Sequence, residues 1–121
     1  MTRWFVSRHP GAYEWLATQG LLVDRQVPHL RLEEVANGDL VIGTLPMQMV
    51  AALCERGVRY VHLALDLPLE ARGRELSAEE MDRYGARLIS YEVREIPTPI
   101  ERPPHVQVRR AAANGALYQL M

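Results

Sequence analysis

The sequence predicts an α/β fold: a single three-layer, Rossmann-like domain with a mainly parallel sheet. The expected strands and helices follow one another in the order β-α-β-β-α-β-α-β, which is typical of an open sheet with helices on both faces. Residues 60–65 are almost continuously apolar, as in a parallel strand that is covered on both sides. The chain has 121 residues, which suffices for one domain with one core.

The chain begins with an apolar run and a helix that starts at a proline. Aromatic and β-branched residues at 3–7 favour a buried strand. Pro10 suits the first turn of a helix, because that turn needs no N–H donor, and Gly20 is typical of a helix end. We therefore expect a helix over residues 10–20 and a short strand at residues 25–27.

The middle of the chain repeats this pattern. A turn signal at residues 37–39, Asn-Gly-Asp, precedes a buried strand at residues 40–43. A second proline opens a helix over residues 46–56, and Gly57 ends it. This helix leads directly to the strand at 60–65.

The last part of the predicted domain contains one capped helix and one strand. Ser77 and Glu80 form a capping-box pattern that opens a short helix. Residues 87–93 predict the final strand. Prolines accumulate after this point and stiffen the chain. We therefore assign the domain to residues 1–95, and a proline-rich extension with a C-terminal tail to residues 96–121.

Composition and charge exclude several classes of function. The net charge of −1 argues against a protein that coats long nucleic acid, since such proteins usually carry a basic excess. All fourteen basic residues are arginine, which excludes a lysine nucleophile and a P-loop lysine. The single cysteine, Cys54, excludes a disulfide framework and a cysteine-rich zinc site. We expect a cytoplasmic protein with no membrane segment, no metal site and no cofactor.

Polar side chains cluster where the first strand gives way to the first helix. Ser7, Arg8 and His9 follow a strand, where open α/β sheets bind ligands, and precede a helix start, which favours an anion. Each also has a structural reading, since Ser7 and His9 could serve only to start the helix and Arg8 could pair with a surface carboxylate. A guanidinium matches phosphate oxygens, and imidazole titrates near neutral pH. We therefore predict that Arg8 binds phosphate and that His9 transfers a proton.

Other candidate ligand contacts lie in neighbouring loops. Thr44 follows the strand at 40–43 and is expected to cap the next helix, to contact the ligand, or both. For His29, a solvated or structural histidine is the alternative to a site role. Arg72 and Glu75 lie in a loop that forms either a solvated face or a cover over the ligand. The predicted ligand contacts are Gly11, His29, Gly43, Thr44, Arg72 and Glu75.

Several short motifs occur together in this chain. They are FVSRHPGA at 5–12 followed by Glu14-Trp15, PHL at 28–30, GDLVIGTLP at 38–46, RGREL at 72–76 and GARL at 85–88. In this order they resemble the sixteenth-numbered family of the Csx group, which are accessory proteins found beside type III CRISPR systems. The resemblance covers residues 1–93 and not the proline-rich tail.

This resemblance implies a CARF-like fold and a ring nuclease. Such proteins bind cyclic oligoadenylate, the second messenger of type III effectors, as homodimers or larger assemblies. They cut it without a metal, and cyclic tetra-adenylate is the usual substrate. We expect a ribose 2′-hydroxyl to attack the adjacent 3′-phosphodiester, which gives linear products with 2′,3′-cyclic phosphate ends.

The expected roles in this reaction follow from the side chains. Arg8 and the N–H groups near Gly11 would stabilise charge on the phosphate, and His9 would move a proton. Ser7 and Thr44 would orient the ribose or the phosphate. The predicted catalytic residues are therefore Ser7, Arg8 and His9.

Two other functions fit the same residues. The pocket could bind a cyclic nucleotide without cutting it, as a sensor or sink domain. Alternatively, the chain could be a small enzyme that acts on a nucleotide or a sugar phosphate. A protein that binds a ring messenger needs a two-fold pocket shared between subunits, whereas a mononucleotide enzyme needs one chain. Native mass with ligand stoichiometry therefore distinguishes a ring-binding protein from a mononucleotide enzyme.

Overall fold

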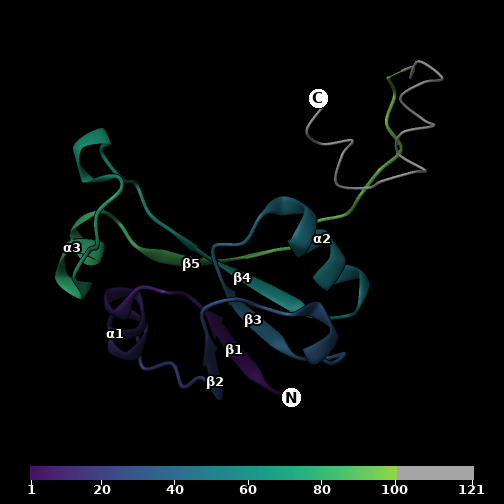
Figure 1. Ribbon diagram of the computed structural model, residues 1–121, viewed down its shortest axis with the longest axis horizontal. Coiled ribbons are helices and arrows are strands. Elements are labelled where there is room, and N and C mark those ends of the chain that lie inside the picture. The colour runs from purple at the N-terminus through teal and green to yellow at the C-terminus, as the bar shows by residue number, and fades with distance from the viewer. Residues whose placement is uncertain (101–121) are drawn as a thin grey trace.

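A five-stranded sheet with the order β2-β1-β3-β4-β5 forms the centre of the molecule (Figure 1). The computed structural model describes residues 1–100. The strands are β1 (Arg3–Val6), β2 (Arg25–Val27), β3 (Leu40–Gly43), β4 (Arg59–Ala64) and β5 (Arg87–Tyr91). The helices are α1 (Pro10–Thr18), α2 (Met47–Glu55) and α3 (Ala78–Arg83), with 3-10 turns η1 (Leu32–Glu34) and η2 (Leu69–Ala71). This order of elements confirms the predicted α/β class.

Parallel pairing dominates the sheet. β1 pairs in parallel with β2 and with β3, and β3 pairs in parallel with β4, whereas β5 runs antiparallel to β4. Trp4 lies beside Val41 and Val41 beside Tyr60, while Phe5 lies beside Ile42. Because successive side chains of a strand point to opposite faces, each face of the sheet carries its own apolar layer.

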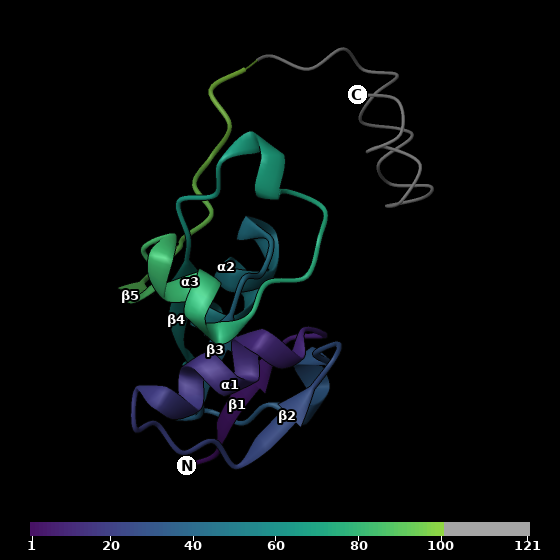
Figure 2. The same ribbon diagram turned by 90° about the vertical axis from the view of Figure 1, so that its left-hand side faces the viewer.

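Helices cover both faces, so the domain has three layers. α1 and α3 lie on one face, in front of the sheet in Figure 2, and α2 lies on the other. The indole Nε1 of Trp15 donates to Asp82 at 2.7 Å and so ties α1 to α3. Buried on this side are Phe5, Ala12, Trp15, Leu16, Ile42, Leu63 and Met81. Buried on the α2 side are Trp4, Leu30, Val35, Val41, Val50, Leu53, Val58 and Tyr60.

One carboxylate is buried at the amino end of the sheet. Asp39 is 5% exposed and accepts a hydrogen bond from the indole Nε1 of Trp4 at 3.1 Å. Its two oxygens also accept backbone N–H bonds from Thr2 at 2.9 Å and Ala36 at 3.0 Å. These backbone bonds, with that of Thr2 the largest cause, lower the pKa of the Asp39 carboxyl. The predicted turn at residues 37–39 therefore also contributes a buried charge to the core.

The observed element boundaries differ slightly from the predicted ones. β1 ends at Val6 and β5 at Tyr91, both short of the predicted ends. α2 begins at Met47, and Pro46 is its N-cap residue in an extended conformation. The prediction that Thr44 caps this helix is therefore wrong, because two residues separate its backbone from the first helical residue.

The predicted tail lies mainly outside the described residues. Residues 96–100 follow β5 without regular structure, and residues 101–121 are not within the described range. Across residues 1–100, no helix combines the length and the apolar character that crossing a membrane requires.

Candidate functional site

A pocket of about 920 Å³ opens at the carboxyl ends of β1 and β3. Its walls are the start of α1, the loop after β2, the loop between β3 and α2, and the segment before α3. Most of the predicted site residues line it, namely Ser7, Arg8, His9, His29, Gly43, Thr44 and Glu75. The remaining lining is largely apolar and includes Phe5, Leu45, Met49, Leu65, Leu67 and Met81. An apolar hollow with a few convergent polar groups is typical of a small-molecule site.

The turn between β1 and α1 fixes the first three polar residues. The backbone N–H of Ser7 donates to the Val27 carbonyl at 3.0 Å and extends the pairing with β2. The Ser7 hydroxyl oxygen accepts the N–H of His9 at 3.1 Å. His9 is the N-cap residue of α1, but its side chain makes no capping bond. The imidazole is therefore left to face the pocket.

Arg8 carries the positive charge of this turn. Its side chain is exposed, and within residues 1–100 its guanidinium makes no hydrogen bond or ion pair. Arg8 also borders a second, shallower hollow of about 520 Å³, whose wall includes Tyr13 and Gln26. The guanidinium thus stands at the junction of two hollows, where it can meet an anion from either one.

The β3–α2 loop forms the next wall, beside the end of β1. The hydroxyl of Thr44 donates to the Leu63 carbonyl at 3.1 Å, so this side chain ties the loop to β4. A Cβ added to Gly43 would lie 3.2 Å from the Val6 carbonyl oxygen, tighter than ordinary contact. The glycine therefore allows the pocket edges of β1 and β3 to approach each other closely.

A hydroxyl network that the sequence did not predict supports this wall. The Tyr60 hydroxyl oxygen lies 2.9 Å from the Gly43 carbonyl, 3.0 Å from the Leu45 N–H and 2.7 Å from Nδ1 of His62. A hydroxyl has one hydrogen and two lone pairs, so all three contacts are satisfied when Tyr60 donates to Gly43 and His62 donates through Nδ1–H. Burial raises the pKa of the Tyr60 hydroxyl. His62 is thus a structural histidine whose Nδ1 has a hydrogen-bond partner.

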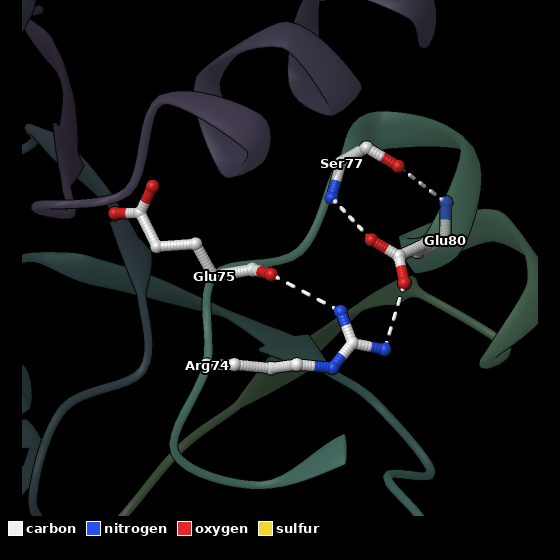
Figure 3. Close-up of polar contacts among 4 residues, drawn as sticks. All are labelled: Arg74, Glu75, Ser77 and Glu80. Atoms are coloured by element: carbon white, nitrogen blue, oxygen red, sulfur yellow. Dashed lines mark hydrogen bonds and ion pairs between the residues drawn. The ribbon is translucent and has the colours of Figure 1, made fainter.

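The segment before α3 forms the third wall and is fixed by Arg74. The Arg74 guanidinium contacts Glu80 at 2.8 Å and the Glu75 carbonyl at 3.3 Å (Figure 3). Ser77 and Glu80 form the predicted capping box at the start of α3, with both bonds at 3.1 Å. The Arg74 bond and then the Ser77 backbone N–H lower the pKa of Glu80 to about 2. Arg74 therefore acts in the structure of this wall, and its position just before a capping box is the sequence signal for that role.

Two predicted site residues lie elsewhere. Gly11 does not line the pocket. A Cβ at this position would collide with the Leu76 carbonyl oxygen. Its role is close packing of α1 against the segment before α3. Arg72 is exposed and is also absent from the pocket wall. Arg74, from the same loop, lines the pocket in its place.

The histidines of the pocket differ in their surroundings. Nδ1 of His9 lies 3.6 Å from Oε1 of Glu75, across the gap between α1 and the segment before α3. His29 is exposed in the loop after β2 and lines the pocket. Among the described residues, no three His, Cys, Asp or Glu side chains are close enough to hold a metal ion together. The groups that line the pocket include a guanidinium with no partner among residues 1–100, an imidazole with a carboxylate neighbour, and two hydroxyls.

Fold and pocket together define a small α/β protein with a pocket, lined by arginine and histidine side chains among others, at the carboxyl edge of a mainly parallel sheet. Residues 4–94 match the family model described as "Putative CRISPR-associated protein (Cas_VVA1548)". The chain belongs to this family of CRISPR-associated proteins. The matched residues contain the sheet except for Arg3 of β1, together with all three helices and every pocket residue named above. No curated protein and no solved structure matches the chain.

Proposed function

We propose that this protein is a metal-independent ring nuclease of the sixteenth-numbered Csx family. It binds cyclic oligoadenylate, with cyclic tetra-adenylate as the expected substrate, and cuts it in the cytoplasm to switch off type III CRISPR signalling. The observation that carries this proposal is the convergence of Ser7, Arg8, His9 and Thr44 in one pocket of a CRISPR-associated protein. The messenger is polyanionic, and the pocket presents a guanidinium that no described side chain neutralises.

The proposed reaction is an internal transfer of the phosphodiester. The ribose 2′-oxygen forms a bond to phosphorus, and the bond from phosphorus to the 5′-oxygen breaks. The protein has to hold the sugar and phosphate in line, and positioning of this kind lowers barriers by about 7–11 kcal/mol in favourable cases. Val6 and Gly43 are paired in register on adjacent strands, so Ser7 and Thr44 follow neighbouring strand ends and both line the pocket. They are placed to orient the ribose from the same edge of the sheet.

Charge and proton transfer fall to the other two residues. Arg8 stabilises the negative charge that grows on the phosphate oxygens, and one such donor contributes about 3–4 kcal/mol. His9 accepts the proton of the 2′-hydroxyl, and general base catalysis adds roughly 10²–10⁴ in rate. We choose His9 over His29, the other histidine in the pocket lining named above, because His9 is at the start of α1 and is adjacent to Arg8.

We propose that the active form is a homodimer or a larger assembly. A ring of four identical nucleotides has internal symmetry, and a two-fold dimer presents the same residues twice. Two pockets that face one ring would engage two phosphates in equivalent ways.

The test is incubation of the full chain with cyclic oligoadenylates of several sizes in EDTA, followed by mass spectrometry. Linear oligoadenylates with 2′,3′-cyclic phosphate ends are the expected products. Loss of cleavage in EDTA with recovery in magnesium or manganese would contradict the metal-independent mechanism. Tight binding of intact rings without cleavage would contradict the nuclease proposal and indicate a sensor or sink domain instead. If a mononucleotide binds and the rings do not, the substrate class is wrong.

A further inference from the structure

We propose that Glu75 is a positioning residue for His9, and that the two form a histidine–carboxylate pair that Arg74 and the start of α3 hold in place. The consequence of this pair for catalysis rests on the proposed function. The pair itself rests on geometry and can be tested without any substrate.

The two partners come from separate parts of the chain. His9 is the N-cap residue of α1, and Glu75 lies in the segment before α3. Their atoms Nδ1 and Oε1 are 3.6 Å apart, and their side chains are 60% and 70% exposed. This is the distance of a charge pair rather than of a finished hydrogen bond. At this distance the anionic carboxylate still favours the tautomer whose ring hydrogen faces it, by electrostatic attraction.

Glu75 is available to His9 because a different carboxylate occupies Arg74. One guanidinium nitrogen of Arg74 contacts Glu80, and another donates to the backbone carbonyl of Glu75. Figure 3 shows the Glu75 carboxylate turned away from this guanidinium, whose two bonds are drawn to Glu80 and to the Glu75 backbone. Glu80 is in turn held by Ser77 through the capping box. The backbone of Glu75 is thus anchored while its carboxylate points to the other wall.

The second anchor is the contact between Gly11 and Leu76. Without a side chain at Gly11, the Leu76 carbonyl packs directly against the first turn of α1. His9 and Glu75 therefore each stand within two residues of a tight backbone contact. This contact limits the motion of the two walls relative to each other, and it keeps the imidazole and the carboxylate within reach.

The pair gives the imidazole a defined tautomer. When Nδ1–H donates to the Glu75 carboxylate, the lone pair remains on Nε2. In the proposed reaction the 2′-oxygen bonds to phosphorus and its proton moves to Nε2 of His9. The bond to the 5′-oxygen breaks, this oxygen takes a proton from water, and the hydroxide that is left takes the proton from Nε2 of His9, which restores the neutral ring. The carboxylate stabilises the imidazolium that forms and is not itself protonated.

The first measurement is the tautomer of the His9 ring in the full-length protein. Nitrogen-15 NMR in alkaline buffer, where imidazoles are neutral, reports which ring nitrogen carries the hydrogen, and His9→Asn identifies the signal. We expect an excess of the Nδ1–H form in the wild type. Glu75→Gln should return the ring to the distribution of a free imidazole, and Glu75→Asp should restore part of the excess.

The second measurement is cleavage of cyclic tetra-adenylate by the same variants. Glu75→Gln should lower kcat by about ten- to a hundredfold, part of what a general base contributes, and leave KM within about twofold. Arg74→Met should lower kcat in the same direction by a smaller factor, because it frees the backbone of Glu75. Glu79→Gln is the matched control, since Glu79 is an exposed carboxylate in the first turn of α3, and it should change neither quantity.

These results separate the inference from the proposed function. An unchanged His9 tautomer in Glu75→Gln overturns the pair, even if the wild type cleaves rings. An altered tautomer with unchanged kcat overturns the positioning role. If the wild type cleaves no ring, the proposed function fails, and the tautomer alone decides whether Glu75 positions His9.

Discussion

The Leu76 carbonyl oxygen occupies the space that a side chain on Gly11 would need. This contact joins the first turn of α1 to the segment before α3, and both form walls of the pocket. It explains a glycine at a helical position, where glycine costs conformational entropy relative to alanine. The site is therefore sensitive to a residue that does not line it.

Replacing this glycine should destabilise the domain. Gly11→Ala forces a methyl group against a backbone oxygen, and overpacking of this kind costs about 1–3 kcal/mol. Urea unfolding followed by circular dichroism measures the change. Glu14→Ala, an exposed change in the same helix, is the control and should stay within about 0.5 kcal/mol. Equal stabilities of the two variants would show that α1 and the segment before α3 can move apart without loss of folding free energy.

The buried carboxylate of Asp39 should make stability depend on pH. Its pKa is lowered in the folded protein from an ordinary value of 3.8, so its contribution is full above that value and is lost as the pH falls through the lowered one. Asp39→Asn should destabilise the protein at neutral pH, because an amide presents one acceptor to the Thr2, Ala36 and Trp4 donors. The difference from the wild type should shrink in acid, as followed by urea unfolding at a series of pH values. A difference that grows in acid would contradict the assignment.

Removing the Tyr60 hydroxyl should weaken the β3–α2 wall. Tyr60→Phe leaves the Gly43 carbonyl and the Leu45 N–H without this partner, and unsatisfied buried groups cost about 1–3 kcal/mol. Thermal unfolding measures the loss. Tyr91→Phe is the matched control, because Tyr91 is half exposed and its ring packs in a T-shaped arrangement with His62, which the substitution keeps. A Tyr60→Phe protein as stable as this control would mean that water replaces the hydroxyl.

Arg8 should carry more of the proposed catalysis than any other arginine. Loss of one donor to the developing charge lowers kcat by about 10²–10³, and Arg8→Ala should also weaken binding of the intact ring. Single-turnover cleavage and ring binding are measured in parallel. Arg83→Ala removes an exposed arginine at the end of α3, outside the pocket, and should leave both unchanged. Equal losses in the two variants would indicate a general charge effect.

The order of the strands and helices along the chain could be predicted from the sequence alone. Apolar runs, prolines at helix starts and glycines at helix ends are local signals, and they predicted every strand and helix in sequence. The ends of the strands and helices were predicted less accurately, because the conformation of a residue just after a strand depends on contacts with residues distant in sequence. Ser7 leaves β1 although its N–H still bonds to Val27, and Pro46 takes the capping position that Thr44 was expected to fill.

The pocket was predictable only where it is built from local turns. Ser7, Arg8 and His9 follow a strand directly, so their placement came from sequence alone. The Tyr60 hydroxyl bonds to Gly43 and Leu45, which are seventeen and fifteen residues away in the sequence. No local sequence pattern predicts such a contact. Arg72 and Arg74 lie in the same predicted loop, and the ion pair between Arg74 and Glu80 shows which of them is held at the pocket wall.

The strand order has a consequence for how the protein is made. After β2, each new strand adds to the edge that the previous one left free: β3 beside β1, β4 beside β3 and β5 beside β4. No late strand has to insert between two early ones. A chain that leaves the ribosome amino end first therefore supplies its strands in the order in which the sheet can accept them. The segment that carries Arg8 and His9 is made near the start of synthesis, and the segment that carries Glu75 follows only after four of the five strands.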